Sequence, residues 1–272
     1  MKLIIQIPCY NEETTLPVSL SALPRQVEGV SVVEWLVVDD GSTDRTAEVA
    51  KAHGVDHVVS HPKNLGLAKA FMTGLRSCIE LGADIIVNTD ADNQYRADCI
   101  PDLIRPIVDG MAEIVIGARP IDQIKHFSFM KKLLQKLGSW TVRLASKTDI
   151  PDAPSGFRAI SREAAQKLNV FNSYTYTLET IIQAGQKGIS ITWVPVSINE
   201  DLRPSRLVRS MPSYVRKSIL TILRIFVVYK PFRFFMSIGV GFLLVGTLIG
   251  LRFLYHYFTG GGSGHIQSLI LA

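Results

Sequence analysis

The 272-residue chain has few cysteines and none of the common phosphate-binding loops. Its three cysteines, Cys9, Cys78 and Cys99, are too few and too scattered for a disulfide framework or a zinc site, which fits a reducing compartment. No Gly-x-Gly-x-x-Gly follows the first apolar run, and no Gly-x-x-x-x-Gly-Lys-Ser/Thr occurs, which argues against a dinucleotide-binding Rossmann domain and a P-loop NTPase. The opening apolar run, residues 3–7, is too short for a signal peptide, so we expect the N-terminal part in the cytosol.

Acidic residues are scarce in two stretches that are rich in basic ones. Residues 124–147 contain no acid, and residues 201–233 carry eight Lys and Arg against the single acid Asp201. With a formal net charge of +5, this indicates an anionic partner, either nucleic acid or a membrane. Residues 234–251 have no charge at all and approach the roughly 20 residues that span a bilayer. Because the cations adjoin this segment, we expect a membrane partner and no nucleic acid.

Apolar runs alternate with helical patterns through the first two hundred residues. We expect strands at 3–7, 32–38, 55–59, 112–116 and 189–196 and a further strand beginning at Ile85. Helices are expected between them, including 100–108, 124–147 and 176–187, whereas 149–159 reads as a loop. Alternation of this kind predicts right-handed βαβ units and an α/β fold with a mostly parallel sheet.

Two of the expected strands end in clustered carboxylates. Asp39 and Asp40 follow the second strand, and Asp90 and Asp92 follow the fourth, with Gln94 two residues further on. Ligand sites of open α/β sheets lie beyond the carboxyl ends of the strands. Hard oxygen ligands suit Mg²⁺ or Mn²⁺, which bind through one or two carboxylates plus substrate phosphates. The alternative is an Asp-rich turn without a ligand.

Five motifs in order carry a family resemblance: residues 8–12 (PCYNE), 38–42 (VDDGS), 90–94 (DADNQ), 117–119 (GAR) and 155–158 (SGFR). Together they resemble the family-2 glycosyltransferases of GT-A fold. The resemblance is stronger to the polyprenyl-phosphate branch, such as dolichyl-phosphate mannose synthases and undecaprenyl-phosphate glucosyltransferases. It implies a GT-A α/β domain that moves a hexose from a UDP- or GDP-linked sugar to polyprenyl phosphate. The motifs do not name the sugar.

The resemblance also implies roles for residues on the donor side. Pro8, Tyr10 and Glu12 would line the nucleotide pocket, and Asp40 would hydrogen-bond the base. Asp90 would contact the ribose or the sugar, while Asp92 and Gln94 would hold Mg²⁺ or Mn²⁺ on the diphosphate. Arg203 and Arg206 would close over the diphosphate, with membrane-surface cations as the alternative for both.

On the acceptor side, charge suggests the candidates. A lipid phosphate brings its own anionic oxygen, so it needs orientation and charge neutralisation more than a base. Arg119, Lys132 and Arg143 are candidates to bind it. A rival family-2 enzyme acting on a saccharide or diacylglycerol-lipid hydroxyl would need a carboxylate base, for which Glu179 or Asp152 would serve. The alternatives are a surface carboxylate for Glu179 and an ion pair of Asp152 with Arg158. A scaffold that only binds nucleotide sugar is the rival of another class.

Charge and hydropathy suggest four segments. Residues 1–209 would form the cytosolic catalytic domain, 210–231 an amphipathic juxtamembrane helix and 232–258 a transmembrane helix. Residues 259–272 would form a loop and the start of a second transmembrane helix that is cut short. The basic residues orient the catalytic domain to the cytoplasmic face of the cell (inner) membrane. A homo-oligomer is left open.

Overall fold

The structure, a computed structural model, describes residues 1–120, 129–170, 176–199, 219–220, 223–224, 227–229 and 231–259. The chain divides into two compact units, Met1–Ser218 and Ile219–Ala272. The first unit holds all the described strands, and the second holds one long apolar helix. Each unit is considered by itself below.

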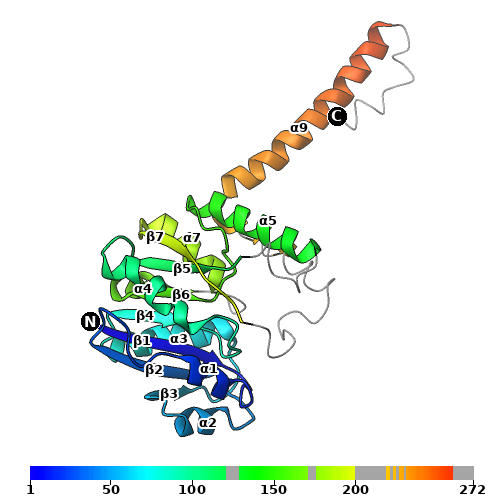
Figure 1. Cartoon of the computed structure of the whole chain (residues 1–272). Helices are drawn as coiled ribbons and strands as arrows, with labels where there is room; N and C mark the ends of the chain where they lie inside the picture. The colour runs from blue at the N-terminus through cyan, green and yellow to red at the C-terminus, as the bar shows by residue number, and fades with distance from the viewer. Residues whose placement is uncertain are drawn as a thin grey trace. The chain divides into compact units, whose positions relative to one another are not determined.

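A seven-stranded sheet forms the centre of the first unit, in the order β3-β2-β1-β4-β6-β5-β7 (Figure 1). The strands β1, β2, β3 and β4 pair in parallel, as do β5 and β7, whereas β6 is antiparallel to both its neighbours. The prediction of an α/β fold with a mostly parallel sheet is confirmed. The strand bounds are β1 Lys2–Cys9, β2 Val32–Asp39, β3 His57–Ser60, β4 Ile85–Asn88, β5 Ile114–Ala118, β6 Arg158–Ser161 and β7 Ile191–Pro195.

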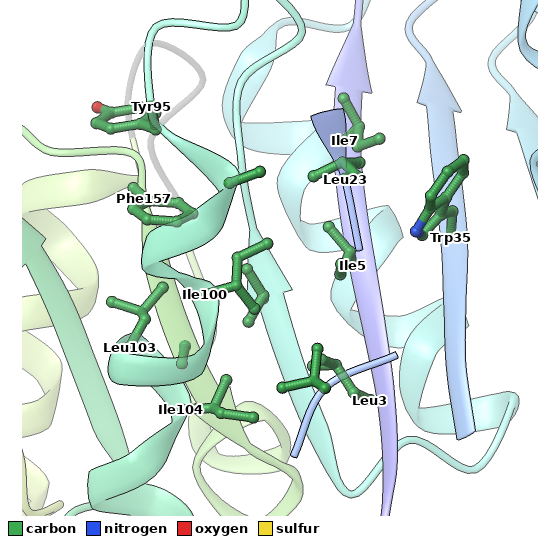
Figure 2. Packing of buried hydrophobic residues seen from close by; sticks show 14 of the residues in the cluster. Leu3, Ile5, Ile7, Leu23, Trp35, Tyr95, Ile100, Leu103, Ile104 and Phe157 are labelled. Carbon is green, nitrogen blue, oxygen red and sulfur yellow. The ribbon is translucent and has the colours of Figure 1, made fainter. Parts of the chain in front are cut away.

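Helices cover both faces of the sheet. Alternate residues of β1 point to opposite faces, so Leu3, Ile5 and Ile7 enter a cluster with α1 and α4 (Figure 2). Gln6 points the other way, toward Gly74 of α3. The described helices of this unit are α1 Leu16–Ala22, α2 Thr46–Ala52, α3 Leu67–Glu80, the short 3₁₀ helix η1 Ala97–Cys99, α4 Ile100–Val108, α5 Phe129–Ser146, α6 Arg162–Lys167 and α7 Thr177–Lys187.

The strand β6 corrects the sequence prediction of a loop over 149–159. The loop ends at Phe157, and β6 runs between β4 and β5 in the sheet. Sequence pattern concealed this strand because it is four residues long and begins with an arginine, a residue type that is rarely fully buried. Its antiparallel direction brings residues 155–157 to the sheet edge where β4 ends, since Arg158 is the register partner of Asn88.

The second unit contains α9, Pro231–Phe258, which is long and apolar enough to cross a bilayer, and none of its residues is buried. The predicted amphipathic helix at 210–231 falls largely outside the described residues, with helical pieces at 219–220, 223–224 and 227–229. The segment expected to start a second transmembrane helix, from 260 onward, lies outside them as well. The four-segment division therefore stays a prediction.

Candidate active site

The loops that follow β1, β2 and β4 form the donor half of the candidate site, because these three parallel strands are neighbours. The first two loops are joined through Asn11, which adopts a left-handed conformation with φ 55°. Its backbone N–H donates to Ser42 Oγ at 2.9 Å, and its side-chain oxygen accepts from the Thr43 N–H at 2.8 Å. Glu12 N–H donates to Thr46 Oγ1 at 2.8 Å. The PCYNE and DDGST motifs are thus one hydrogen-bonded unit.

The predicted donor-binding residues occupy this unit in different ways. Tyr10 is exposed, whereas Pro8 is buried within β1 opposite Val38. Glu12 is buried and accepts a hydrogen bond of 2.5 Å from Thr15 Oγ1. Tyr10 is therefore the member of the predicted pocket whose ring has room to contact a ligand.

Asp40 is buried, and its carboxylate holds the loop before α3. It accepts the backbone N–H groups of Leu65 at 2.9 Å and Gly66 at 2.8 Å, and lies 2.7 Å from His61 Nδ1. The other ring nitrogen of His61 is 2.9 Å from Thr73 Oγ1 on α3. The structure thus gives Asp40 internal partners at both oxygens, and its contact with a base stays a prediction.

The turn after β4 brings Asp90, Asp92 and Gln94 together. Gln94 N–H donates to Asp92 Oδ1 at 3.2 Å, and the intervening Asn93 has φ 56°. Asn199, in the segment after β7, holds this turn by two hydrogen bonds. Its side-chain amide donates to the Asn93 carbonyl at 2.8 Å, and its backbone N–H donates to the Gln94 carbonyl at 2.9 Å. Nothing in the sequence pattern marked Asn199, because its partners are carbonyls distant in sequence.

Asp90 lies against a glycine that leaves no room for a side chain. A Cβ on Gly156 would be 3.0 Å from both Asp90 carboxylate oxygens and from the Tyr176 hydroxyl. Asn88 on β4 secures this approach by donating to the Gly156 carbonyl and to Tyr176 Oη, each at 2.9 Å. Asn88 was missed at the sequence level, although a polar residue inside an apolar strand is itself a signal for a buried hydrogen bond.

Burial raises the pKa of Asp90 to about 7, and the neighbouring Asp92 carboxylate acts in the same direction. Arg119 and Arg158 act in the opposite direction, and a bound metal cation would lower the pKa of Asp90 further. In the described part of the chain, no group of three or more His, Cys, Asp or Glu side chains gathers that could hold a metal. Mg²⁺ and Mn²⁺ complete their coordination with water and substrate phosphate, and their binding by Asp92 and Gln94 stays a prediction.

Arg119, at the end of β5, faces this turn and is held by Asp152. Its Nε lies 2.7 Å from Asp152 Oδ2 and its Nη2 lies 3.1 Å from Oδ1, which is a two-point ion pair between buried side chains. Its Nη1 donates to Gln94 Oε1 at 3.3 Å. Burial alone would lower the pKa of Arg119, but the nearby Tyr95, Asp152 and Asp90 outweigh it and raise that pKa. A permanent cation thus adjoins the predicted metal turn.

The alternative that Asp152 forms an ion pair with Arg158 is wrong, because Asp152 pairs with Arg119. Arg158 is fully buried on β6 and instead donates to Thr180 Oγ1 at 2.5 Å, to the Thr177 carbonyl at 3.3 Å and to the Ser155 carbonyl. Burial lowers the pKa of its guanidinium. Arg158 therefore joins the SGFR loop to the start of α7.

The remaining candidates lie on α5 and α7 or outside the described residues. Lys132 and Arg143 are on α5, and Arg143 Nη1 is 3.7 Å from Asp149 Oδ1. Glu179 is buried on α7 with Gln183 Nε2 at 3.4 Å, so its alternative as a surface carboxylate is wrong. Arg203 and Arg206 lie outside the described residues.

A mixed α/β sheet with carboxylate turns at the ends of β2 and β4 and an arginine at the end of β5 is a GT-A-like arrangement. The model of glycosyl transferase family 2 matches residues 4–168. The chain belongs to this family and is a glycosyltransferase.

Two relatives and one solved structure illustrate the similarity. The chain is 31% identical over 213 residues (70% of this chain, 82% of the relative) to the UDP-N-acetylglucosamine–dolichyl-phosphate N-acetylglucosaminyltransferase of Methanococcus voltae. It is 27% identical over 210 residues (74% and 84%) to the undecaprenyl-phosphate mannosyltransferase of Micrococcus luteus. Glucosyl-3-phosphoglycerate synthase from Mycobacterium tuberculosis, crystallised with Mn²⁺, UDP and glucosyl-3-phosphoglycerate, matches with a TM-score of 0.61 at 22% identity (81% and 79%), which shows the shared fold.

Proposed function

We propose that this protein is a membrane-anchored, inverting glycosyltransferase that moves a hexose from a UDP- or GDP-sugar to polyprenyl phosphate. The observation that carries the proposal is the contact of Arg119 with Gln94. It sets a fixed cation beside the predicted metal turn, so a donor diphosphate and an acceptor phosphate would meet there. The relatives named for dolichyl and undecaprenyl phosphate support the acceptor class.

On the donor side, the chain's own groups position the leaving nucleotide. Tyr10 and the loop held by Asp40 offer the nucleoside surface, and Asp90 faces the ribose or the sugar. Asp92 and Gln94 would hold Mg²⁺ or Mn²⁺, whose Lewis acidity would stabilise the charge that grows on the departing diphosphate. Arg203 and Arg206 belong to the same proposal as cations that close over the diphosphate.

On the acceptor side, the guanidinium of Arg119 has five N–H donors, and three of them meet Asp152 and Gln94. The described residues offer no acceptor for the other two, which we assign to a phosphate oxygen. Lys132 and Arg143 on α5 are proposed as further phosphate contacts. Because the phosphate is already anionic, the nucleophile requires no carboxylate base, and Asp152 is already committed to Arg119. This favours the phosphate acceptor over a hydroxyl acceptor, for which the other candidate base named above is the buried Glu179.

The helix α9 and the basic residues before it support a location at the cytoplasmic face of the cell membrane. There the catalytic unit would meet an acceptor phosphate at the headgroup level.

The test is transfer by the purified full chain in lipid vesicles, with polyprenyl phosphate, labelled UDP- and GDP-sugars, and Mg²⁺ or Mn²⁺. A labelled glycolipid is expected, with Asp92→Ala reducing its formation at least 100-fold. The matched control is Asp102→Ala, which removes an exposed carboxylate of α4 and leaves transfer unchanged. Label appearing only on a saccharide or diacylglycerol lipid would select the rival acceptor, and a fully active Asp92→Ala enzyme would refute the metal turn.

A further inference from the structure

The outward face of α5 carries a row of large apolar side chains that the fold of the described chain leaves uncovered. Leu133, Leu137, Trp140 and Leu144 are 49%, 44%, 51% and 39% exposed. Their spacing of four, three and four residues places them along one side of the helix. We call these four residues the outer row. Contiguous apolar rows of this kind on a protein surface mark interaction sites more often than chance exposure.

The opposite side of α5 packs against the rest of the catalytic unit. Leu134, Val142 and Ala145 are buried. Near its end, α5 approaches α7 so closely that a Cβ on Gly185 would be 1.9 Å from the Ser146 carbonyl oxygen. The helix is therefore held rigidly with the outer row outward, and it cannot rotate to hide that row without losing this packing.

Basic residues accompany the outer row along one edge. Lys132, Lys136 and Arg143 each stand one residue before a leucine of the row, which places all three about 100° to the same side of it. The helix contains no Asp or Glu. Arg143 also faces Asp149, which is highly exposed. An apolar row with a tryptophan and an edge of cations fits the boundary between headgroups and acyl chains of an anionic bilayer.

We propose that the outer row of α5 is a second membrane contact, in which the four apolar side chains enter an anionic bilayer and the adjoining cations meet its phosphates. A second copy of this chain would bring the same cations against each other, since the edge is basic on both copies, so charge favours lipid over self-association. This contact belongs to the catalytic unit and is distinct from the apolar helix α9.

The lipid contact would influence catalysis through residues on the buried side of α5. Ser139 Oγ accepts the Ala153 N–H at 3.1 Å, and the adjacent Asp152 holds Arg119. A bilayer against α5 thus fixes the distance between the lipid surface and the loop whose Asp152 holds Arg119, the proposed acceptor-side cation. This consequence rests on the proposed function, whereas the lipid contact itself does not.

The experiment reads lipid contact without turnover. The full chain with Cys99→Ser, which leaves only the buried Cys9 and Cys78, receives Leu137→Cys and an environment-sensitive NBD label. The matched control is Met111→Cys, a site of even higher exposure before β5. In vesicles of phosphatidylglycerol and phosphatidylcholine we expect a blue shift and at least twofold quenching of position 137 by spin-labelled acyl chains, with no change at position 111. Adding Lys136→Glu should weaken quenching at position 137.

The proposal would be overturned if the label at position 137 were as exposed to water as the label at position 111. The proposal would also be overturned if the blue shift at position 137 depended on the density of protein in the vesicles and the acyl-chain quencher had no effect on it. That result would mark a second copy as the occupant. A further variant then separates the lipid contact from the proposed acceptor. It carries serine at all four outer-row positions, Leu133, Leu137, Trp140 and Leu144. If position 137 embeds, yet the parent transfers no sugar to polyprenyl phosphate, the proposed acceptor fails and the lipid contact stands. If both hold, the serine variant should raise the KM for polyprenyl phosphate in vesicles about tenfold while donor binding stays unchanged.

Discussion

The ion pair of Arg119 with Asp152 offers the sharpest prediction, because it is both buried and close to the chemistry. Its side chains are 7% and 1% exposed, so neither charge can turn to solvent if the other is removed. Breaking a buried pair by deleting one partner typically costs about 3–5 kcal/mol, since the remaining charge is left uncompensated. We expect Asp152→Ala to lower the free energy of unfolding of the catalytic unit by this amount.

The measurement is urea unfolding of the full chain in detergent, followed by fluorescence of Trp35, which is buried and covered by the Arg25 guanidinium at 3.4 Å. Trp140 and Trp193 are exposed and are replaced by Phe in every variant. With an m-value of about 2 kcal/mol per M, the expected loss lowers the midpoint by about 1.5–2.5 M.

A double-mutant cycle decides whether the pair itself is responsible. Arg119→Met with Asp152→Leu removes both charges and should recover most of the lost stability, because apolar pairs often replace buried ion pairs at no net cost. The same double variant should remain inactive, since the guanidinium that contacts Gln94 is removed. A midpoint shift below about 0.5 M for Asp152→Ala, or a double variant no more stable than either single one, would refute this reasoning. Recovered transfer in the double variant would exclude Arg119 from acceptor binding.

Three further predictions concern the site and its supports. Asp90→Asn should stabilise the metal-free fold by on the order of 4 kcal/mol above pH 7, because the folded state holds the Asp90 proton more tightly than the unfolded state. The gain should grow from about pH 4 to pH 7 and then level off in pH-dependent urea unfolding, whereas a gain that is equally large at pH 4 would contradict a titrating carboxyl. Asn199→Ala should weaken Mn²⁺ binding about tenfold by releasing the Asn93 carbonyl, measured by calorimetry with UDP or GDP present, and an unchanged affinity would show that the turn holds itself. Gly185→Ala should cost at least about 3 kcal/mol, because its Cβ would meet the Ser146 carbonyl oxygen, whereas the matched Gly138→Ala on α5 meets nothing within 4 Å and should be neutral or stabilising.

The loops that carry the donor-side candidates were predictable as loops at one edge of the sheet, because their signals are local. Each of the loops after β1, β2 and β4 follows a strand that the apolar pattern identifies, and parallel neighbours bring their carboxyl ends to one edge. The five ordered motifs then located Asp92, Gln94 and Arg119 without any structure. Helix α4 was predicted at 100–108, the bounds that the structure shows.

The supports of the site were not predictable, since their partners are distant in sequence. Asp152 holds a residue 33 positions away, and Asn88 reaches the Gly156 carbonyl across 68 positions. A sequence shows that such a polar residue needs a partner, but not which one it takes. This is why Asp152 was assigned to Arg158, its neighbour in the chain, when the sheet places Arg119 beside it.

The antiparallel strand β6 explains why the turn after β4 and Arg119 after β5 share one supporting loop. If β5 followed β4 directly in the sheet, the residues that precede Arg158 would lie elsewhere, and Asp90 would have no glycine loop beneath it. Because β6 runs against β4 and β5, the loop leading into it arrives at the edge where both neighbours end. That loop delivers Gly156 to Asp90 and Asp152 to Arg119 from positions only four residues apart. A displacement of the loop would therefore disturb Asp90, the proposed donor-side carboxylate, and Arg119, the proposed acceptor-side cation, together.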